Sequence, residues 1–295
     1  MGYFIKRGLV NAIASLSLPG IYRLSDFLFF LVYKVFKYRT GLVVSNISKA
    51  FPNKSKNEIA AITEDYYRKL CDTILETLKM AKLSYEELNP YIDYHPEPVN
   101  KLFEENRNIV LALSHQFNWE WGNWPLGLES GYQIQIFYKP LTDKAMEAIL
   151  NGIRSKYGTR LISVYDKLDG IRKLTSNRPT MNIFMADQNP NNLKSCAWFD
   201  FFGQKTPFQM GLEKFAIETG YPVVFLEVLR PERGMISNRF TLAFENPKET
   251  KPGEITQAYV KFIEESIRRN PSNYVWSHNR WKHSSKYPGG NGIEN

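Results

Sequence analysis

The chain contains few of the residues that build small metal or disulfide cages. Its 295 residues include only two cysteines, Cys71 and Cys196, and four histidines. Two cysteines cannot form a disulfide framework or a cysteine-rich zinc site, and they are typical of reduced thiols in a cytosolic compartment. Outside residue 115, the histidines show no spacing typical of metal ligands. We therefore expect neither a metal nor another cofactor.

The sequence also has no apolar run long enough to cross a bilayer. Its most apolar stretch, FLFFLVY at residues 27–33, lies between Asp26 and Lys34, and a helical span needs about twenty such residues. A helix lying in the membrane interface fits better, with basic side chains reaching lipid phosphates. The alternative is a buried core helix. Five apolar side chains share one face of the expected helix: Ile21, Leu24, Leu28, Leu31 and Val35.

A glycine-rich phosphate loop is absent, because no G-x-x-x-x-G-K-[ST] pattern occurs. Charge gives a clearer indication, since 38 Lys and Arg against 30 Asp and Glu leave a net +8. Residues 1–45 hold six basic residues and one acid, so most of the excess lies beside the most apolar stretch. This combination favours an anionic membrane surface over a nucleic acid, and the alternative is an ordinary basic surface.

Strand and helix patterns alternate through the rest of the chain. A capping box at residues 55–58 predicts a helix that runs to about Ala81, and residues 89–98 indicate a turn-rich connector. Short apolar strands are then expected at 109–113, 134–138, 160–164, 180–185, 223–229 and 239–244. Helices are expected at 119–128, 143–156, 166–176, 211–219 and 255–269.

This alternation predicts an α/β fold with a mostly parallel central sheet flanked by helices. We expect one such domain over residues 46–283, behind a membrane-associating helical segment at 1–45. The polar, glycine-containing tail at 284–295 is expected to be disordered.

The candidate chemistry lies in IVLALSHQFNWEWG, at residues 109–122. His115 follows an apolar strand, and ligands bind at the carboxyl edge of open α/β sheets. Glu120 lies five residues later, where a strand-to-helix turn can bring the two side chains together. An imidazole steadied by a carboxylate is a general base that can take a proton from a hydroxyl. A core histidine bonded to a nearby glutamate would give the same pattern.

The neighbouring sequence resembles the glycerolipid acyltransferases with a His-x4-Asp/Glu signature, and in particular the family that adds secondary acyl chains to lipid A precursors. Residues 21–55, IYRLSDFLFFLVYKVFKYRTGLVVSNISKAFPNKS, are similar to the family's N-terminal run. Further blocks follow in the family's order: NWE at 118–120, YKP at 138–140, ADQ at 186–188, FFG at 201–203, GYPVV at 220–224 and YVWSHNRWK at 274–282. Gln116 and Phe117 depart from it, because the family commonly has an aromatic residue and then glycine there.

The resemblance implies that His115 is the general base, with Glu120 as its partner, in a glycerolipid acyltransferase-like fold. An acyl chain would pass from acyl carrier protein to a hydroxyl of a lipid A precursor at the cytoplasmic face of the inner membrane. Lys139 and Arg154 are candidate contacts for phosphate or phosphopantetheine. Asn118 is a candidate substrate contact that also shapes the loop, and Asp187 either orients a basic side chain or holds a loop.

Three alternatives stay open. The same chemistry could act on another acceptor, such as an aminolipid or a pigment ester. A serine hydrolase could use Ser114, although no G-x-S-x-G elbow is present. A membrane-docked binding protein could have lost catalysis through the Phe117 substitution.

Overall fold

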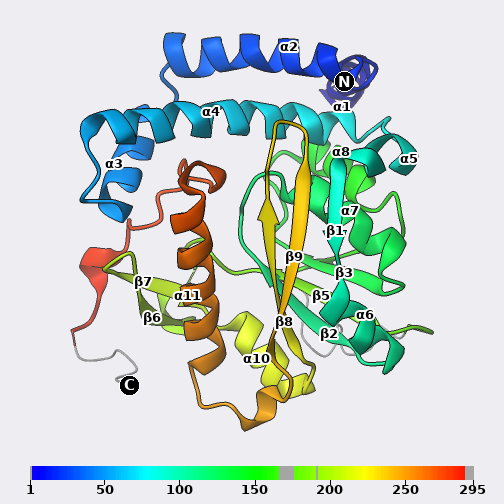
Figure 1. Cartoon of the computed structure of the whole chain (residues 1–295), viewed down its shortest axis with the longest axis vertical. Coiled ribbons are helices and arrows are strands. Elements are labelled where there is room, and N and C mark those ends of the chain that lie inside the picture. The colour runs from blue at the N-terminus through cyan, green and yellow to red at the C-terminus, as the bar shows by residue number, and fades with distance from the viewer. Residues whose placement is uncertain (1, 166–175, 191, 290–295) are drawn as a thin grey trace.

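A seven-stranded sheet forms the centre of the protein (Figure 1). The structure is a computed structural model that describes residues 2–165, 176–190 and 192–289. The strand order is β1-β9-β8-β2-β5-β3-β4, and every neighbouring pair is parallel except β8 with β9. The expected α/β fold with a mostly parallel sheet is therefore confirmed. The strands are β1 Ile92–His95, β2 Ile109–Leu113, β3 Gln133–Tyr138, β4 Arg160–Ser163, β5 Thr180–Met185, β8 Val223–Leu229 and β9 Ile236–Phe244.

Helices cover both faces of this sheet. Alternate residues of the central strand β2 belong to two separate apolar clusters, with Val110 and Ala112 in one and Ile109, Leu111 and Leu113 in the other. Helices α10 and α11 contribute to the first cluster, and α6, α7 and α8 to the second. Burial on both faces explains why β2 is an uninterrupted apolar run. These helices are α6 Glu97–Glu104, α7 Trp119–Glu129, α8 Lys144–Arg154, α10 Gly211–Thr219 and α11 Glu254–Arg269.

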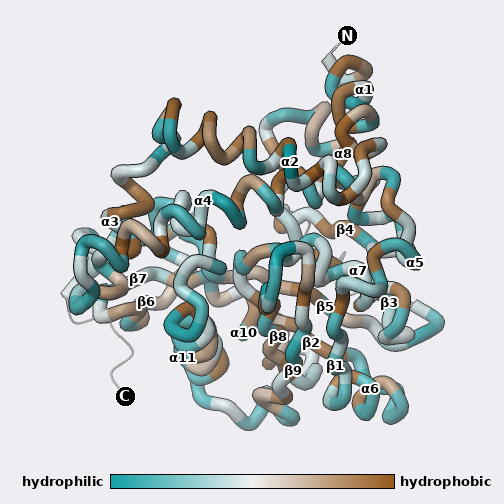
Figure 2. Tube along the Cα trace, turned by 45° about the horizontal axis from the view of Figure 1, so that its top comes forward, coloured by the Kyte–Doolittle hydropathy of each residue, from teal (hydrophilic) through white to brown (hydrophobic). Residues whose placement is uncertain are grey.

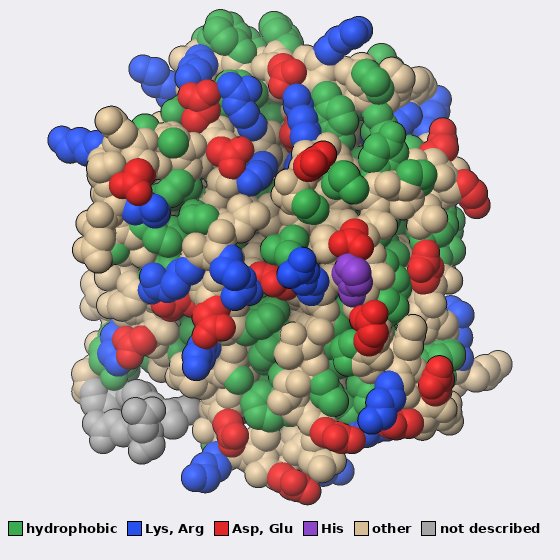
Figure 3. Space-filling model, in the orientation of Figure 1, with side chains coloured by type: hydrophobic (Ala, Val, Ile, Leu, Met, Phe, Trp, Pro, Cys, Tyr) green, Lys and Arg blue, Asp and Glu red, His purple; other side chains and the backbone are tan. Residues whose placement is uncertain are grey.

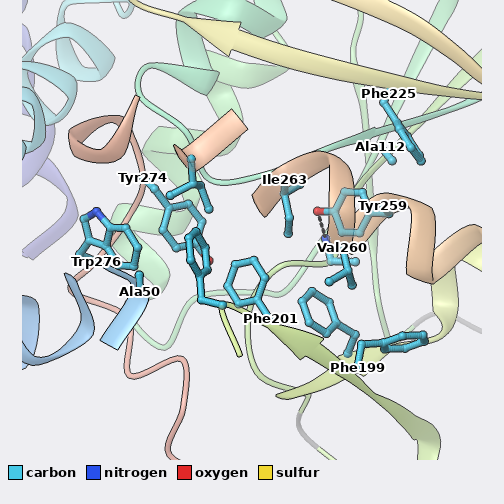
Figure 4. Packing of buried hydrophobic residues seen from close by; sticks show 14 of the residues in the cluster. Ala50, Ala112, Phe199, Phe201, Phe225, Tyr259, Val260, Ile263, Tyr274 and Trp276 are labelled. Carbon is cyan, nitrogen blue, oxygen red and sulfur yellow. Dashed lines mark hydrogen bonds between the residues drawn. The ribbon is translucent and has the colours of Figure 1, made fainter. Parts of the chain in front are cut away.

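A two-stranded hairpin that the sequence patterns did not predict lies beside α11. Strands β6, Cys196–Phe201, and β7, Gln204–Gln209, pair antiparallel around Phe202 and Gly203, which both have positive φ angles. A two-residue turn with positive φ at both positions matches the twist of the paired strands, and glycine, here Gly203, is preferred at its second position. Phe199 and Phe201 extend into the apolar cluster next to Val260 and Ile263 of α11 (Figure 4).

The N-terminal segment packs along the long helix α4, Lys56–Lys79. It consists of α1, Gly2–Ala14, then α2, Leu18–Phe29, which continues as a π-helix over Phe30–Val35, and α3, Thr40–Ala50. The expected domain boundary at residue 45 falls inside α3. The expected lipid-facing stripe is wrong in part, because Ile21 is fully buried and Leu28 packs against the core. The remaining short helix, α5, spans Tyr85–Leu88.

No single helix in the described part of the chain is long and apolar enough to cross a membrane. Helix α1 and the helix at Leu18–Val35 pass that test only as a pair, and they are bent by 117° at their junction. Figure 2 shows apolar stretches on both of them.

Other differences from the sequence-based expectations are local. The connector at 89–98 contains strand β1, which pairs with β9 at the edge of the sheet. Residues 284–286 form a short 3₁₀ helix, and Tyr287 packs against Trp198, so the beginning of the tail is ordered against the hairpin. The helix expected at 166–176 lies outside the described residues except for Ser176.

The capping box predicted from the sequence is present at the start of α4. Ser55 Oγ accepts the Glu58 N–H, and the Glu58 carboxylate accepts the Ser55 N–H at 2.8 Å. Replacing a serine cap by alanine typically costs about 1 kcal/mol. We expect Ser55→Ala to lower the free energy of unfolding by about that amount in urea titrations followed by circular dichroism. The same change at Ser15, which follows the end of α1, is the control, and equal stability of Ser55→Ala and wild type would contradict the capping role.

Candidate active site

Two adjacent parallel strands bring His115 and Asp187 together. In the register of β2 and β5, Leu113 is opposite Met185. His115 and Asp187 each lie two residues beyond this pair, at the carboxyl edge of the sheet where open α/β folds bind ligands. Both residues were predicted to lie at strand ends, but their pairing depends on β2 and β5 being neighbours.

Asp187 makes two contacts with His115. Its Oδ1 lies 2.8 Å from the imidazole Nδ1, and its Oδ2 accepts the backbone N–H of His115 at 3.2 Å. Asp187 is fully buried, whereas the His115 side chain is 21% exposed. Burial acts to raise the pKa of Asp187, but the charge and hydrogen bonds of His115 outweigh it and lower this pKa below its ordinary value. The site therefore holds an anionic carboxylate behind a partly exposed imidazole.

Tyr259 of α11 fixes the spacing of the two strand ends. Its hydroxyl donates to the carbonyl oxygen of Leu113 at 2.7 Å and accepts the N–H of Ala186 at 3.3 Å. Figure 4 shows this buried tyrosine near Val260 and Ile263 of the same helix, with a dashed line that marks a hydrogen bond of its hydroxyl. Nothing in the local sequence distinguishes Tyr259 from the apolar residues of the same helix face, so its role was not predicted.

Glu120 does not pair with His115, so the expected catalytic pair is wrong in this structure. Both carboxylate oxygens of Glu120 lie 3.1 Å from Nε of Arg154, and one also binds Nη2. Burial acts to lower the pKa of Arg154, but the charge and hydrogen bonds of Glu120 outweigh it and raise this pKa above its ordinary value. Glu120 lies in the first turn of α7 and Arg154 at the end of α8, so the pair joins two helices of the same sheet face.

Asn118 caps helix α7. Its Oδ1 accepts the N–H groups of Glu120 and Trp121, and its Nδ2 donates to Glu76 at 3.0 Å. The side chain is fully buried, so the expected substrate contact is replaced by a structural one, whereas the expected shaping of the loop is confirmed.

The departures at Gln116 and Phe117 are accommodated within the fold. Neither residue has a positive φ angle, so this loop does not require glycine at either position. Phe117 is fully buried beside Tyr66, with 5.7 Å between their ring centroids, and Gln116 donates to Ser266 Oγ at 2.7 Å. Trp119 meets the His115 ring edge-on at 5.3 Å.

The two candidate phosphate contacts differ in their surroundings. Lys139 is exposed and directly follows β3, which pairs with β5, so it lies at the same edge of the sheet as His115 and Asp187. Arg154 has two of its nitrogens engaged by Glu120. A small cavity beside this pair is lined by Asn123, Trp124, Ile136 and Tyr157 as well. The phosphate role of Lys139 and Arg154 stays a prediction.

Ser114, the nucleophile of the hydrolase alternative, is buried. It is 1% exposed, and its Oγ has no hydrogen-bond partner among the described residues. A serine nucleophile needs a base that accepts its proton and access to a substrate. Neither condition is met at Ser114.

The closing YVWSHNRWK block forms a second polar layer behind the site. His278 Nε2 accepts the N–H of Asn189 at 3.1 Å, and the buried Arg280 donates to Asn189 Oδ1 and to the carbonyl oxygen of Pro207. Burial and the charge of Arg280 lower the pKa of His278 to about 4. No cluster of His, Cys, Asp or Glu suited to a metal ion occurs among the residues that the structure describes.

The α/β fold places the contact between His115 and Asp187 at the edge of the sheet where such folds bind ligands. Comparison with protein families specifies the class of protein. The model of the bacterial lipid A biosynthesis acyltransferases matches residues 1–283. The chain therefore belongs to this family, and it is an acyltransferase.

The comparisons with individual proteins are less close. No curated protein sequence matches the chain. Among solved structures, it is similar to the 1-acyl-sn-glycerophosphate acyltransferase PlsC of Thermotoga maritima, with 13% identity, a TM-score of 0.38, and coverage of 86% of this chain and 96% of that one. This likeness is too distant to carry an argument about substrates.

The neutral state of His278 predicts an acid-sensitive stability. The folded protein binds this proton near pH 4 and the unfolded chain near pH 6.5, so the free energy of unfolding falls as the pH is lowered through that window. In His278→Gln, the side-chain oxygen can still accept the Asn189 N–H. Between pH 6.5 and 4.5, we expect the free energy of unfolding of this variant to fall by about 1 kcal/mol less than that of wild type. This figure allows for the partial exposure of the His278 ring. Urea titrations at several pH values measure this, and parallel pH profiles would contradict it.

Proposed function

We propose that the protein transfers a fatty acyl chain from acyl carrier protein to a hydroxyl group of a lipid A precursor at the cytoplasmic face of the inner membrane. Family membership supports acyl transfer to this class of lipid. The contact between His115 Nδ1 and Asp187 is the single observation that carries the mechanism, because it supports Nε2 as the ring nitrogen that acts as the base. No cofactor takes part in the proposed reaction.

A carboxylate can only accept a hydrogen bond, so Nδ1 of His115 carries the proton and Nε2 presents a lone pair. Among the described residues, no side chain or backbone group binds Nε2. The ring is partly exposed at the sheet edge, while its partner is buried. This supports a general base that faces a substrate and is held in one tautomer from behind.

The reaction proceeds in two steps. Nε2 of His115 takes the proton of the acceptor hydroxyl as its oxygen bonds to the thioester carbonyl carbon, which forms a tetrahedral oxyanion. The oxyanion then collapses, the C–S bond breaks, and the imidazolium returns its proton to the departing thiolate. Asp187 stabilises the imidazolium between the steps. No serine or cysteine of the protein needs to form a covalent bond.

An apolar surface on the N-terminal helices supports association with lipid. We call this surface the N-terminal apolar patch; its members are Phe4, Ile5, Leu9, Phe27, Phe30 and Phe36. Phe4 is 78% and Phe36 72% exposed. Figure 3 shows hydrophobic side chains, with Lys and Arg beside them, along the edge where Figure 1 places α1 and α2. Exposed aromatic residues beside basic ones are typical of helices that dock onto anionic lipid.

The transfer itself is the first test. Purified protein with acyl carrier protein charged with a labelled fatty acid should acylate a lipid A precursor, and His115→Gln should lose at least about 10²-fold in kcat because its general base is removed. Mass spectrometry of the lipids measures the product. Product that forms equally with His115→Gln would rule out the mechanism, and product that forms only on an aminolipid or pigment alcohol would move the function to that acceptor.

Two further variants separate the roles of the carboxylates. Asp187→Asn should lower kcat by about 10²-fold or more, because the amide no longer holds Nδ1–H or stabilises the imidazolium. Glu120→Gln combined with Arg154→Gln removes the other pair without leaving a buried charge, and it should retain more activity than Asp187→Asn. The reverse order would identify Glu120 as the partner of the base. Circular dichroism confirms folding of each variant.

Lipid docking gives a separate prediction. Replacing Phe27 and Phe30 by serine should weaken binding to vesicles of phosphatidylethanolamine and phosphatidylglycerol by at least about 10-fold, because each phenylalanine side chain contributes about 1.5–3 kcal/mol on full burial. The matched control replaces Leu128 and Leu242, which are exposed elsewhere, in the same way. Co-sedimentation measures both, and equal binding of the two variants would contradict docking through the patch.

A further inference from the structure

A buried charge network connects helix α2 to the catalytic turn. Its centre is Glu76 of α4, which is 1% exposed and accepts three side-chain hydrogen bonds. Tyr22 Oη of α2 donates to Oε1 at 3.0 Å, Arg230 Nη2 to Oε1 at 2.8 Å, and Asn118 Nδ2 to Oε2 at 3.0 Å. One carboxylate therefore binds a helix that carries part of the N-terminal apolar patch, the segment after β8 and the turn that holds His115.

The second carboxylate, Asp72, lies one helical turn earlier and binds the same two elements. It accepts hydrogen bonds from Ser25 Oγ of α2 at 2.6 Å and from Arg230 Nη2 at 2.9 Å. Arg233 donates to Asp72 and also to Asp26 of α2, and its guanidinium lies 4.7 Å from the centre of the Tyr22 ring. Helix α2 is therefore held by several directed hydrogen bonds in addition to apolar packing.

On the other side of Glu76, the network ends at the start of α7. Asn118 accepts the N–H groups of Glu120 and Trp121, and the indole N–H of Trp121 donates to the backbone oxygen of Glu76 at 3.0 Å. Only Gln116 and Phe117 separate Asn118 from His115, and both are buried. A shift of Asn118 would be transmitted to the base through a chain segment that has little free space.

We propose that Glu76 is a positioning residue for acyl transfer, which holds the turn around His115 in a fixed position relative to α2. Docking of α2 on a lipid surface would then order the catalytic turn. The proposal rests on the proposed function for its kinetic part and for the docking of α2 on lipid. The ordering of the turn is a property of the fold that can be measured without a reaction.

The physical basis is the cost of moving any member alone. Removing a buried charge from its hydrogen-bond partners costs several kcal/mol of stability. A movement of Glu76 is therefore expected to carry Arg230 and Asn118 with it. The outer face of α2 exposes Phe27, while its inner face places Tyr22 on Glu76. Lipid that restrains the outer face therefore also restrains the hydroxyl that contacts Glu76.

Hydrogen exchange tests the coupling directly. Wild type is compared with Tyr22→Phe, which loses only the hydroxyl that reaches Glu76, and with Tyr33→Phe as the matched control on the adjoining π-helix, where the ring stacks on Tyr67. Each is measured with and without vesicles of phosphatidylethanolamine and phosphatidylglycerol, and co-sedimentation establishes equal binding. We expect vesicles to slow exchange of the amides of residues 115–121 at least about threefold in wild type and Tyr33→Phe, but not in Tyr22→Phe. Equal slowing in all three, or none in wild type, would overturn the coupling.

A polarity swap tests the positioning role. In Glu76→Gln, an amide N–H group faces the amide N–H group of Asn118, so two donors meet. In Asn118→Asp, two carboxylates face each other. The double variant restores a pair of one donor and one acceptor. In the transfer assay, each single variant should lose about 10-fold or more in kcat with KM for acyl carrier protein unchanged, and the double variant should return to within about threefold of wild type. A double variant that recovers thermal stability without recovering kcat would overturn the positioning role. A wild type without transfer activity would refute the proposed function, and hydrogen exchange would still decide the coupling.

Discussion

The hydrogen bond between Asp187 and His115 is the interaction on which the site depends. It selects the tautomer of the imidazole, and it requires the ends of β2 and β5 to stay at one separation. Tyr259 maintains that separation by bonding to the backbone of both strands. The aromatic cluster around Tyr259, which joins α11 to the β6–β7 hairpin, therefore supports the contact between His115 and Asp187 as well as the fold. In the proposed mechanism His115 needs such a rigid core, because a base that moves by an ångström loses much of its effect.

The sequence was most informative where a local pattern determines the structure. The apolar run of β2 gave the bounds of that strand, and the capping box gave the start of α4, whose expected end at about Ala81 lies two residues beyond the observed one. His115 and Asp187 were both placed at strand ends for the same reason. Their partnership could not be predicted, because it depends on which strands are neighbours, and residues 114–179 separate β2 from β5 along the chain.

The error at Glu120 has a physical cause. A spacing of five residues allows contact if the turn directs both side chains to one side, but the Asn118 cap starts α7 so that Glu120 faces α8. Arg154, the last residue of α8, binds the Glu120 carboxylate there, and the sequence pattern of α8 did not predict this contact. The missed β1 strand has a comparable origin, since its four residues form a strand only by pairing with β9, which is distant along the chain.

The charged groups around the catalytic turn are better explained by orientation than by stability. Asp72, Glu76 and Arg230 are each at most 5% exposed, and Glu120 is also buried. Well-packed apolar residues of similar volume often give equal or greater stability than buried ion pairs, because the charges lose their hydration. Hydrogen bonds add what apolar contacts lack, namely fixed directions for the groups they join. If stability were the only requirement, apolar residues could replace these charged side chains. A fold that holds an imidazole against a carboxylate, and that in our proposal docks its N-terminal helices on lipid, gains from keeping them.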